Sequence, residues 1–154
     1  MTMPSKLTLL LGIALFVIQA LGVSCEPKPK NKVKITYNLF VGDAVDRNDR
    51  ITLSVPANSN FYQAMVVAAA ENCAFKFTAT DYAGLGHFIN TISDVTEDRG
   101  ANKYWMIYIT DTPPTPKCPP PDSALSPVGV DSIIVQNGKY YTFWYKTVDM
   151  GKHT

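Results

Sequence analysis

Few side chains in this sequence of 154 residues have the types and spacing that catalysis or metal binding needs. Asp43, Asp46 and Asp49 are spaced like calcium ligands, but the segment 42–50 lacks the central Gly and the closing Glu of an EF-hand loop. The sequence therefore favours a polar turn there. His87 follows a glycine-rich turn, yet the chain has no Gly-x-Ser-x-Gly, no His-Glu-x-x-His and no glycine-rich phosphate loop. We expect a protein without enzymatic activity, and a small hydrolase or transferase that uses His87 is the weakest alternative.

The N-terminal segment has the pattern of a secretory signal peptide. Lys6 precedes an apolar run, Leu7 to Leu21, and small residues follow it. Cleavage after Ser24 and cleavage after Cys25 both satisfy the small-residue rule, and we favour cleavage after Cys25. Because the run is shorter than the roughly 20 residues of a membrane span, residues 1–25 are predicted to be removed. The protein is expected to be secreted, extracellular and without a membrane span.

Two cysteines remain in the mature chain, Cys73 and Cys118. An even pair in an oxidising compartment predicts a disulfide between them. Neither has a Cys or His at zinc-ligand spacing, so we expect no metal site. Lys and Arg number 14 and Asp and Glu number 13, so the net charge of +1 offers no basic field for nucleic acid or for an anionic membrane.

Residues 33–147 carry the alternating pattern of a small folded domain. They follow an extended lead-in rich in Pro and Lys at 26–32 and precede a short tail at 148–154. The order strand, strand, helix and several strands predicts an α+β domain with one helix packed on a mixed or antiparallel sheet. Aromatic residues on both faces of the last strand predict a central or two-sided strand. Strands are predicted at 33–39, 51–55, 75–80, 88–92, 104–110, 133–135 and 140–146.

Cap and turn residues separate these strands. The segment 60–72 is rich in Ala and predicts the helix, with Ser59 or Asn58 as its N-cap. Prolines exclude residues 111–122 from the interior of a sheet and predict a surface loop. Asn137-Gly138 is typical of a hairpin turn before the last strand.

Two segments place aromatic residues beside Gly-rich and Pro-rich loops, at 81–87 and at 104–114. Rigid aromatic area on a surface suits flat or amphipathic ligands, or proteins. The same residues could equally belong to the core, and their spacing leaves both interpretations open.

Short motifs follow one another in a fixed order along the predicted domain. The first are Phe75-Lys76-Phe77, a turn with Gly84, and Ile89-Asn90-Thr91-Ile92, and Tyr104-Trp105 follows about a dozen residues later. The set closes with Gly129-Val130-Asp131 and the aromatic strand after the Asn-Gly turn. This ordered set resembles the C-terminal β-domain of the intrinsic factor and transcobalamin family. The resemblance covers roughly residues 33–147 and implies a small, mainly β domain with one helix, similar to a β-grasp.

In that family cobalamin lies between a large helical barrel and this β-domain, so the resemblance implies cobalamin binding and transport. The barrel, which carries the family's cobalt-coordinating His, has no counterpart in this sequence, and the implied partners are a corrinoid and a separate helical-barrel protein domain. Relatives carry Trp-Gly where this chain has Ala83-Gly84. The alternative is a secreted structural, extracellular-matrix or protein-interaction module that kept the fold without the ligand. By position, the implied ligand-binding residues are Tyr82, Ala83, Gly84, Leu85, Gly86, His87, Trp105, Met106, Ile107, Tyr108, Thr110 and Pro113.

Overall fold

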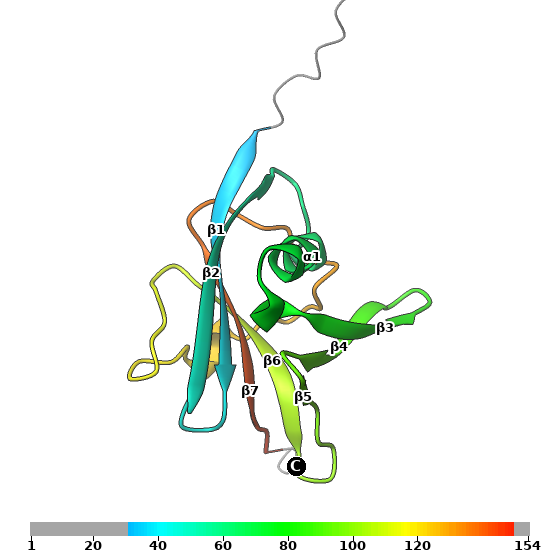
Figure 1. Cartoon of the computed structure of the whole chain (residues 1–154), viewed down its shortest axis with the longest axis vertical. Helices are drawn as coiled ribbons and strands as arrows, with labels where there is room; N and C mark the ends of the chain where they lie inside the picture. The colour runs from blue at the N-terminus through cyan, green and yellow to red at the C-terminus, as the bar shows by residue number, and fades with distance from the viewer. Residues whose placement is uncertain (1–30, 150–154) are drawn as a thin grey trace, which may run out of the picture.

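A computed structural model describes residues 31–149 of the chain (Figure 1). The predicted signal peptide with its cleavage site at Cys25, nearly all of the lead-in, and residues 150–154 lie outside the described residues. The elements, in chain order, are β1 (Lys32–Val41), β2 (Arg47–Pro56), α1 (Phe61–Glu71), the 3-10 turn η1 (Cys73–Phe75), β3 (Phe77–Tyr82), β4 (Gly86–Ile92), β5 (Val95–Thr96), β6 (Lys103–Thr110), the 3-10 turn η2 (Asp122–Ala124) and β7 (Tyr140–Thr147).

The strands form two sheets (Figure 1). The larger has the order β2-β1-β7-β6, in which β1 and β7 are parallel and the other neighbours antiparallel. The smaller has the order β3-β4-β5 and is antiparallel. The predicted fold class, α+β with one helix on a single sheet and similar to a β-grasp, is therefore wrong, because the described residues are mostly β and form two sheets. Alternation locates a strand but does not say which strands share a sheet. Ser93 and Asp94, both with positive φ, turn the chain back from β4 into β5.

The larger sheet is covered on both faces. On one face α1 packs over β1 and β7, where the Tyr37 and Phe61 rings meet edge to face with their centroids 5.1 Å apart. On the other face Phe40 and Trp144 belong to a second buried cluster, to which the loop after β6 contributes Ala124. Figure 1 shows that loop on the side of the sheet opposite α1. β7 lies between β1 and β6 with aromatic residues on both faces, so the predicted central strand is confirmed.

The polar turn after β1 is shorter than predicted. β2 begins at Arg47, which pairs with Val41 of β1, because the backbone hydrogen bonds of the hairpin continue through polar residues. Asp49 lies inside β2 and pairs with Arg47, with 3.4 Å between Nε and Oδ2. Asp43 instead accepts a hydrogen bond from the backbone N–H of Thr147 at 2.7 Å. The three carboxylates of the segment therefore do not share one loop.

α1 begins directly after Asn60, which is its N-cap in place of the predicted Ser59 or Asn58. The Asn60 side chain accepts from the Gln63 backbone N–H at 2.9 Å, and the Gln63 side chain accepts from the Asn60 N–H at 3.0 Å. This reciprocal pair is a capping box, which satisfies two free N–H groups of the first turn. Ser59 lies one residue before this cap, and its carbonyl accepts from the Val135 N–H.

The segment before β7 does not form the predicted hairpin. Residues 133–135 lie against the start of α1, where the Val135 N–H donates to the Ser59 carbonyl at 3.0 Å. Asn137 and Gly138 still form a turn, with φ of +81° at Gly138, but it directs β7 alongside β1 in parallel. The predicted strand at 133–135 is wrong, because its backbone groups bond to the loop before α1 and not to β7.

Cys73 and Cys118 are free thiols, and both are exposed. The predicted disulfide between them is therefore absent from the structure. Cys73 opens η1, on the face of the larger sheet that α1 covers, whereas Cys118 lies in the proline-rich loop on the opposite face (Figure 1). The sequence shows that the mature chain has two cysteines, but it does not show that the larger sheet lies between them.

Candidate functional site

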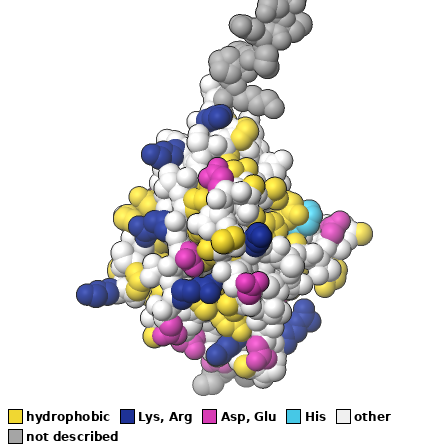
Figure 2. Space-filling model, in the orientation of Figure 1, with side chains coloured by type: hydrophobic (Ala, Val, Ile, Leu, Met, Phe, Trp, Pro, Cys, Tyr) yellow, Lys and Arg dark blue, Asp and Glu magenta, His cyan; other side chains and the backbone are white. Residues whose placement is uncertain are grey.

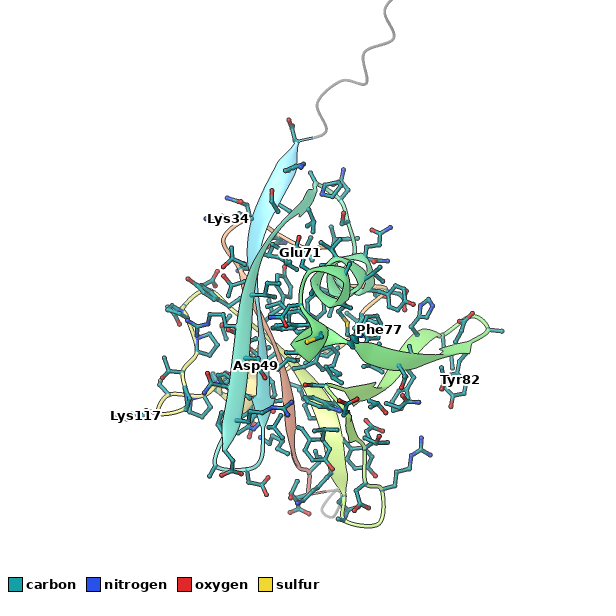
Figure 3. The ribbon with its side chains drawn as sticks, in the orientation of Figure 1. Lys34, Asp49, Glu71, Phe77, Tyr82 and Lys117 are labelled. Carbon is teal, nitrogen blue, oxygen red and sulfur yellow. The ribbon has the colours of Figure 1, made fainter. Side chains whose placement is uncertain are left out.

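The β3–β4 hairpin projects from the body of the molecule (Figures 1 and 3). We call residues 82–86 the hairpin tip. Tyr82 and Leu85 are 46% and 88% exposed, and Figure 3 shows Tyr82 at the far end of the hairpin, away from α1. Gly84 and Gly86 have φ of +81° and +85°, a backbone conformation that glycine adopts without strain. The tip therefore exposes apolar side chains on a backbone that only glycine closes easily, and clustered exposed apolar side chains mark binding surfaces.

Asp131 fixes His87 at the base of this hairpin. The backbone N–H of His87 donates to Oδ2 of Asp131 at 2.6 Å, and the ring Nδ1 is 2.9 Å from Oδ1. The ring of Tyr62 stacks on the imidazole, with centroids 3.8 Å apart and an interplanar angle of 14°. Burial acts to raise the pKa of Asp131, but the hydrogen bonds from His87 outweigh it and the pKa is lowered. The imidazole is thereby held in one orientation, between a carboxylate and an aromatic ring.

A hollow of about 170 Å³ lies between the base of the hairpin and β6, and we call it the His87 hollow. Its aromatic wall is rigid, because Nε1 of Trp105 donates to the Val95 carbonyl at 3.0 Å and the indole meets Phe143 edge to face at 6.2 Å. Figure 2 shows a histidine at the surface beside a group of hydrophobic side chains. The hollow is lined by His87, Phe88, Ile89, Trp105, Ile107, Gly129, Val130 and Phe143.

The structure brings part of the predicted binding set together. His87, Trp105 and Ile107 line the His87 hollow, and the hairpin tip continues outward from His87 along the same hairpin. Met106 lines a second hollow that shares Phe88 and Trp105 with the first. The two hollows adjoin at the edge of β6, and Met106, which packs against the Phe40 and Trp144 cluster, reaches the second hollow from the opposite face of the sheet.

The other predicted residues lie elsewhere. Side chains alternate between the faces of a strand, so Tyr108 points away from Trp105 and packs against Trp144 on the opposite face of the larger sheet. Thr110 ends the same strand, and its hydroxyl donates to the Thr112 carbonyl at 2.8 Å. Pro113 is exposed in the proline-rich loop. The predicted set therefore divides between two faces.

Several residues of this surface were not in the predicted set, and the lining of the hollow includes Phe88, Ile89, Gly129 and Val130 among them. Asp131 belongs to the Gly129-Val130-Asp131 motif, but its spacing from other residues indicated no chemical role. Phe143 could have been found from the alternation of β7, which places it on the α1 face. Tyr62 and Glu97 have no sequence signal, because tertiary packing alone places them beside His87 and Trp105.

The chemistry that this surface offers is contact and hydrogen bonding. Within residues 31–149, no group of three or more His, Cys, Asp and Glu side chains is placed to hold a metal ion. No helix in the same part of the chain has the length and apolar character needed to cross a bilayer. Apolar walls with a few oriented polar groups are typical of small-molecule binding sites.

Comparisons with known proteins support a fold shared with a binding protein. No protein-family model matches the chain. It is 32% identical over 126 residues to uncharacterized protein CG3556 of Drosophila melanogaster, a match that covers 82% of this chain and 21% of that protein. Haptocorrin, solved in complex with Cbi, is similar with a TM-score of 0.60 and 18% identity, over 81% of this chain and 28% of that one. A candidate metal-binding protein of Ruminococcus gnavus has a TM-score of 0.50 and 14% identity, over 76% of this chain and 99% of that one.

These likenesses have a limited meaning. At 18% and 14% identity, the two solved structures show the fold. The chain spans about a fifth of the Drosophila protein and little more than a quarter of the haptocorrin chain. The expected resemblance to cobalamin-binding proteins is thus supported at the level of the fold, and the similar solved structure with the higher TM-score is that of a ligand complex.

Proposed function

We propose that the chain is a secreted, non-enzymatic binding protein that covers one side of a corrinoid, together with a helical-domain partner. The observation that carries the proposal is the His87 hollow with its projecting apolar hairpin tip, on a fold similar to that of haptocorrin. In this proposal the mature domain begins after residue 25 and the ligand contacts come from the hairpin tip and from β6.

The size of the hollow supports a covering role. Sites that enclose a drug-sized ligand measure roughly 300–1,000 Å³, and the His87 hollow measures about 170 Å³. It is large enough to seat one edge of a flat macrocycle, and the remaining surface of the ligand would need a second protein surface. A separate helical-barrel domain is the partner that the family resemblance implies.

Each group has a distinct part in this proposal. Trp105 offers a fixed apolar ring, because its Nε1 is already bonded to Val95. Leu85 and Tyr82 would lose exposed apolar area on contact, worth about 25 cal/mol per Å². Asp131 holds His87 so that the imidazole needs no reorientation when the ligand arrives.

The test is a titration of the purified protein with cobalamin and with cobinamide, with and without the helical domain of haptocorrin supplied separately. We expect a shift in the corrin absorption spectrum and quenching of tryptophan fluorescence when all components are present. Leu85→Ser should weaken binding at least tenfold, because Leu85 is 88% exposed and has no part in the core. Val66→Ser is the matched control, since Val66 is an exposed residue of α1 that does not line the hollow. Absence of any spectral change in every mixture would refute the proposal.

A secreted structural, extracellular-matrix or protein-interaction module is the second candidate. The exposed apolar side chains of the hairpin tip favour it, because they suit contact with another protein as well as with a ligand. Enrichment of the native protein in an insoluble matrix fraction without bound corrinoid would support this candidate. Co-purification with a corrinoid would argue against it.

A further inference from the structure

Glu97 has a buried carboxylate oxygen without a hydrogen-bond partner. The residue follows β5, and its Oε1 accepts a long hydrogen bond from the Trp105 backbone N–H at 3.4 Å. Its Oε2 is shielded from solvent and has no donor among residues 31–149. Burial raises the pKa of this carboxyl, opposed by the Trp105 hydrogen bond and by the charge of Arg99. An unsatisfied buried acceptor destabilises the folded protein, so a donor that reached it would be bound favourably.

Glu97 is the one ionisable carboxylate on the wall of the second hollow, which we call the Glu97 hollow. This hollow has a volume of about 270 Å³ and lies on the exposed edge of β6. Aromatic rings make up much of the wall. The lining residues are Phe88, Glu97, Tyr104, Trp105, Met106 and Val148.

Among residues 31–149, no cation forms an ion pair with this carboxylate within 4.0 Å. The guanidinium of Arg99 lies over the ring of Phe88, 6.0 Å from its centroid, and forms no ion pair with Glu97 within 4.0 Å. The negative charges of Asp98 and Glu97 act on Tyr145, whose pKa is raised mainly by burial. A carboxylate beside aromatic faces suits a cation on an apolar stem, because the rings attract positive charge and the stem takes the apolar wall.

We propose that the Glu97 hollow binds a small primary amine in its ammonium form, with Glu97 as counter-ion and Tyr104 and Trp105 as aromatic walls. The N–H groups are needed, because Oε2 lacks a hydrogen-bond donor and a positive charge alone does not supply one. The last torsion of a Glu side chain is soft, so a small rotation of the carboxyl group presents either oxygen to the ligand. Glu97 does not line the His87 hollow, so this proposal does not rest on corrinoid binding, although Phe88 and Trp105 line both hollows.

The test is a titration of the full chain with hexylammonium, followed by tryptophan fluorescence and by NMR shifts of the Trp105 indole N–H. Two matched probes separate the causes. 1-Hexanol has the same stem without the charge, and hexyltrimethylammonium has the charge without N–H donors. We expect hexylammonium to bind at least tenfold more tightly than either probe. Equal binding of the three probes, or no binding of hexylammonium at millimolar concentration, would overturn the proposal.

Two variants locate the effect. Glu97→Gln keeps the shape of the side chain and an acceptor for the Trp105 N–H, so we expect a folded protein that binds hexylammonium at least tenfold more weakly. Asp98→Asn removes a neighbouring negative charge that does not line the hollow, and it should bind like the wild type. An unchanged affinity in E97Q, or the same loss in D98N, would show that Glu97 is not the counter-ion.

Discussion

Gly86 and Gly84 form a matched pair that tests how the hairpin is held. Both have a positive φ, +85° and +81°, so alanine at either position meets the same backbone strain. They differ in their surroundings. A Cβ at Gly86 would lie 2.6 Å from Oδ2 and 3.1 Å from Cγ of Asp131, whereas a Cβ at Gly84 meets nothing within 4 Å. Gly86→Ala should therefore displace the carboxylate that binds His87, and Gly84→Ala should not.

The magnitude follows from these contacts. An alanine in the left-handed region costs about 1–2 kcal/mol, and both variants carry that cost. Gly86→Ala also weakens two hydrogen bonds from His87 to Asp131. Because Asp131 is partly exposed, weakening these hydrogen bonds should lower the free energy of unfolding by a further ~2 kcal/mol. At about 4 °C per kcal/mol for a domain of this size, G86A should melt about 8 °C below G84A.

The measurement is thermal unfolding of the wild type and both variants by circular dichroism, with hydrogen exchange of the His87 amide as a local readout. The His87 amide should exchange faster in G86A and at the wild-type rate in G84A. In an Asp131→Ala background the carboxylate is gone, so G86A and G84A should then cost the same. Equal melting temperatures of G86A and G84A in the wild-type background would refute the role of Asp131.

Three further results are expected. Asn60→Ala removes the capping side chain of α1 and should cost about 1 kcal/mol, visible as a lower melting temperature; an unchanged value would contradict the capping role. Arg50→Met removes the hydrogen bonds that join β2 to the Asn38 side chain and to the proline-rich loop, so endoproteinase Lys-C should cut after Lys117 faster than in the wild type. Figure 3 shows Lys117 out on that loop, and an unchanged cleavage rate would show that Arg50 does not restrain it. Hydrogen bonds from Thr147 lower the pKa of Asp43 below 3.8. The stability they contribute is therefore complete above the unfolded pKa and lost as the pH falls through the folded pKa. The wild type should melt above Asp43→Asn at pH 6 and lose this advantage as the pH falls below the ordinary pKa of an aspartic acid, and a difference that does not change with pH would contradict this assignment.

The strands and the helix could be predicted because their signals are local. Alternation along β1 and β7, the Ala-rich helix and the prolines after β6 each act within a few residues, and the structure has these elements close to the expected bounds. The first residues of β2 were not predicted as strand because they are polar. Their side chains face solvent, while their backbone forms hydrogen bonds with β1. The helix cap was misplaced by one or two residues, because only the geometry of Asn60 and Gln63 selects among neighbouring polar residues.

Part of the candidate site was also visible in the sequence. The family resemblance predicts the glycines of the hairpin tip, His87 and Trp105 as ligand contacts, and the structure places His87 and Trp105 on one hollow. Tyr108 was assigned to the same site, although its position in the strand puts it on the opposite face. Proximity along a strand is therefore a poor guide to a shared site, since neighbouring side chains point in opposite directions.

The sequence by itself determined most of the long strands, the helix and the main turns, because these preferences depend on the residue and its near neighbours. The tertiary structure alone decided that β3 to β5 form their own sheet, that Cys73 and Cys118 lie on opposite faces, and that Asp131 reaches His87. The same holds for the unpartnered oxygen of Glu97 beside Trp105. The physical reason is that these positions follow from how whole sheets and the helix pack together, which the preferences of single residues and their near neighbours do not specify.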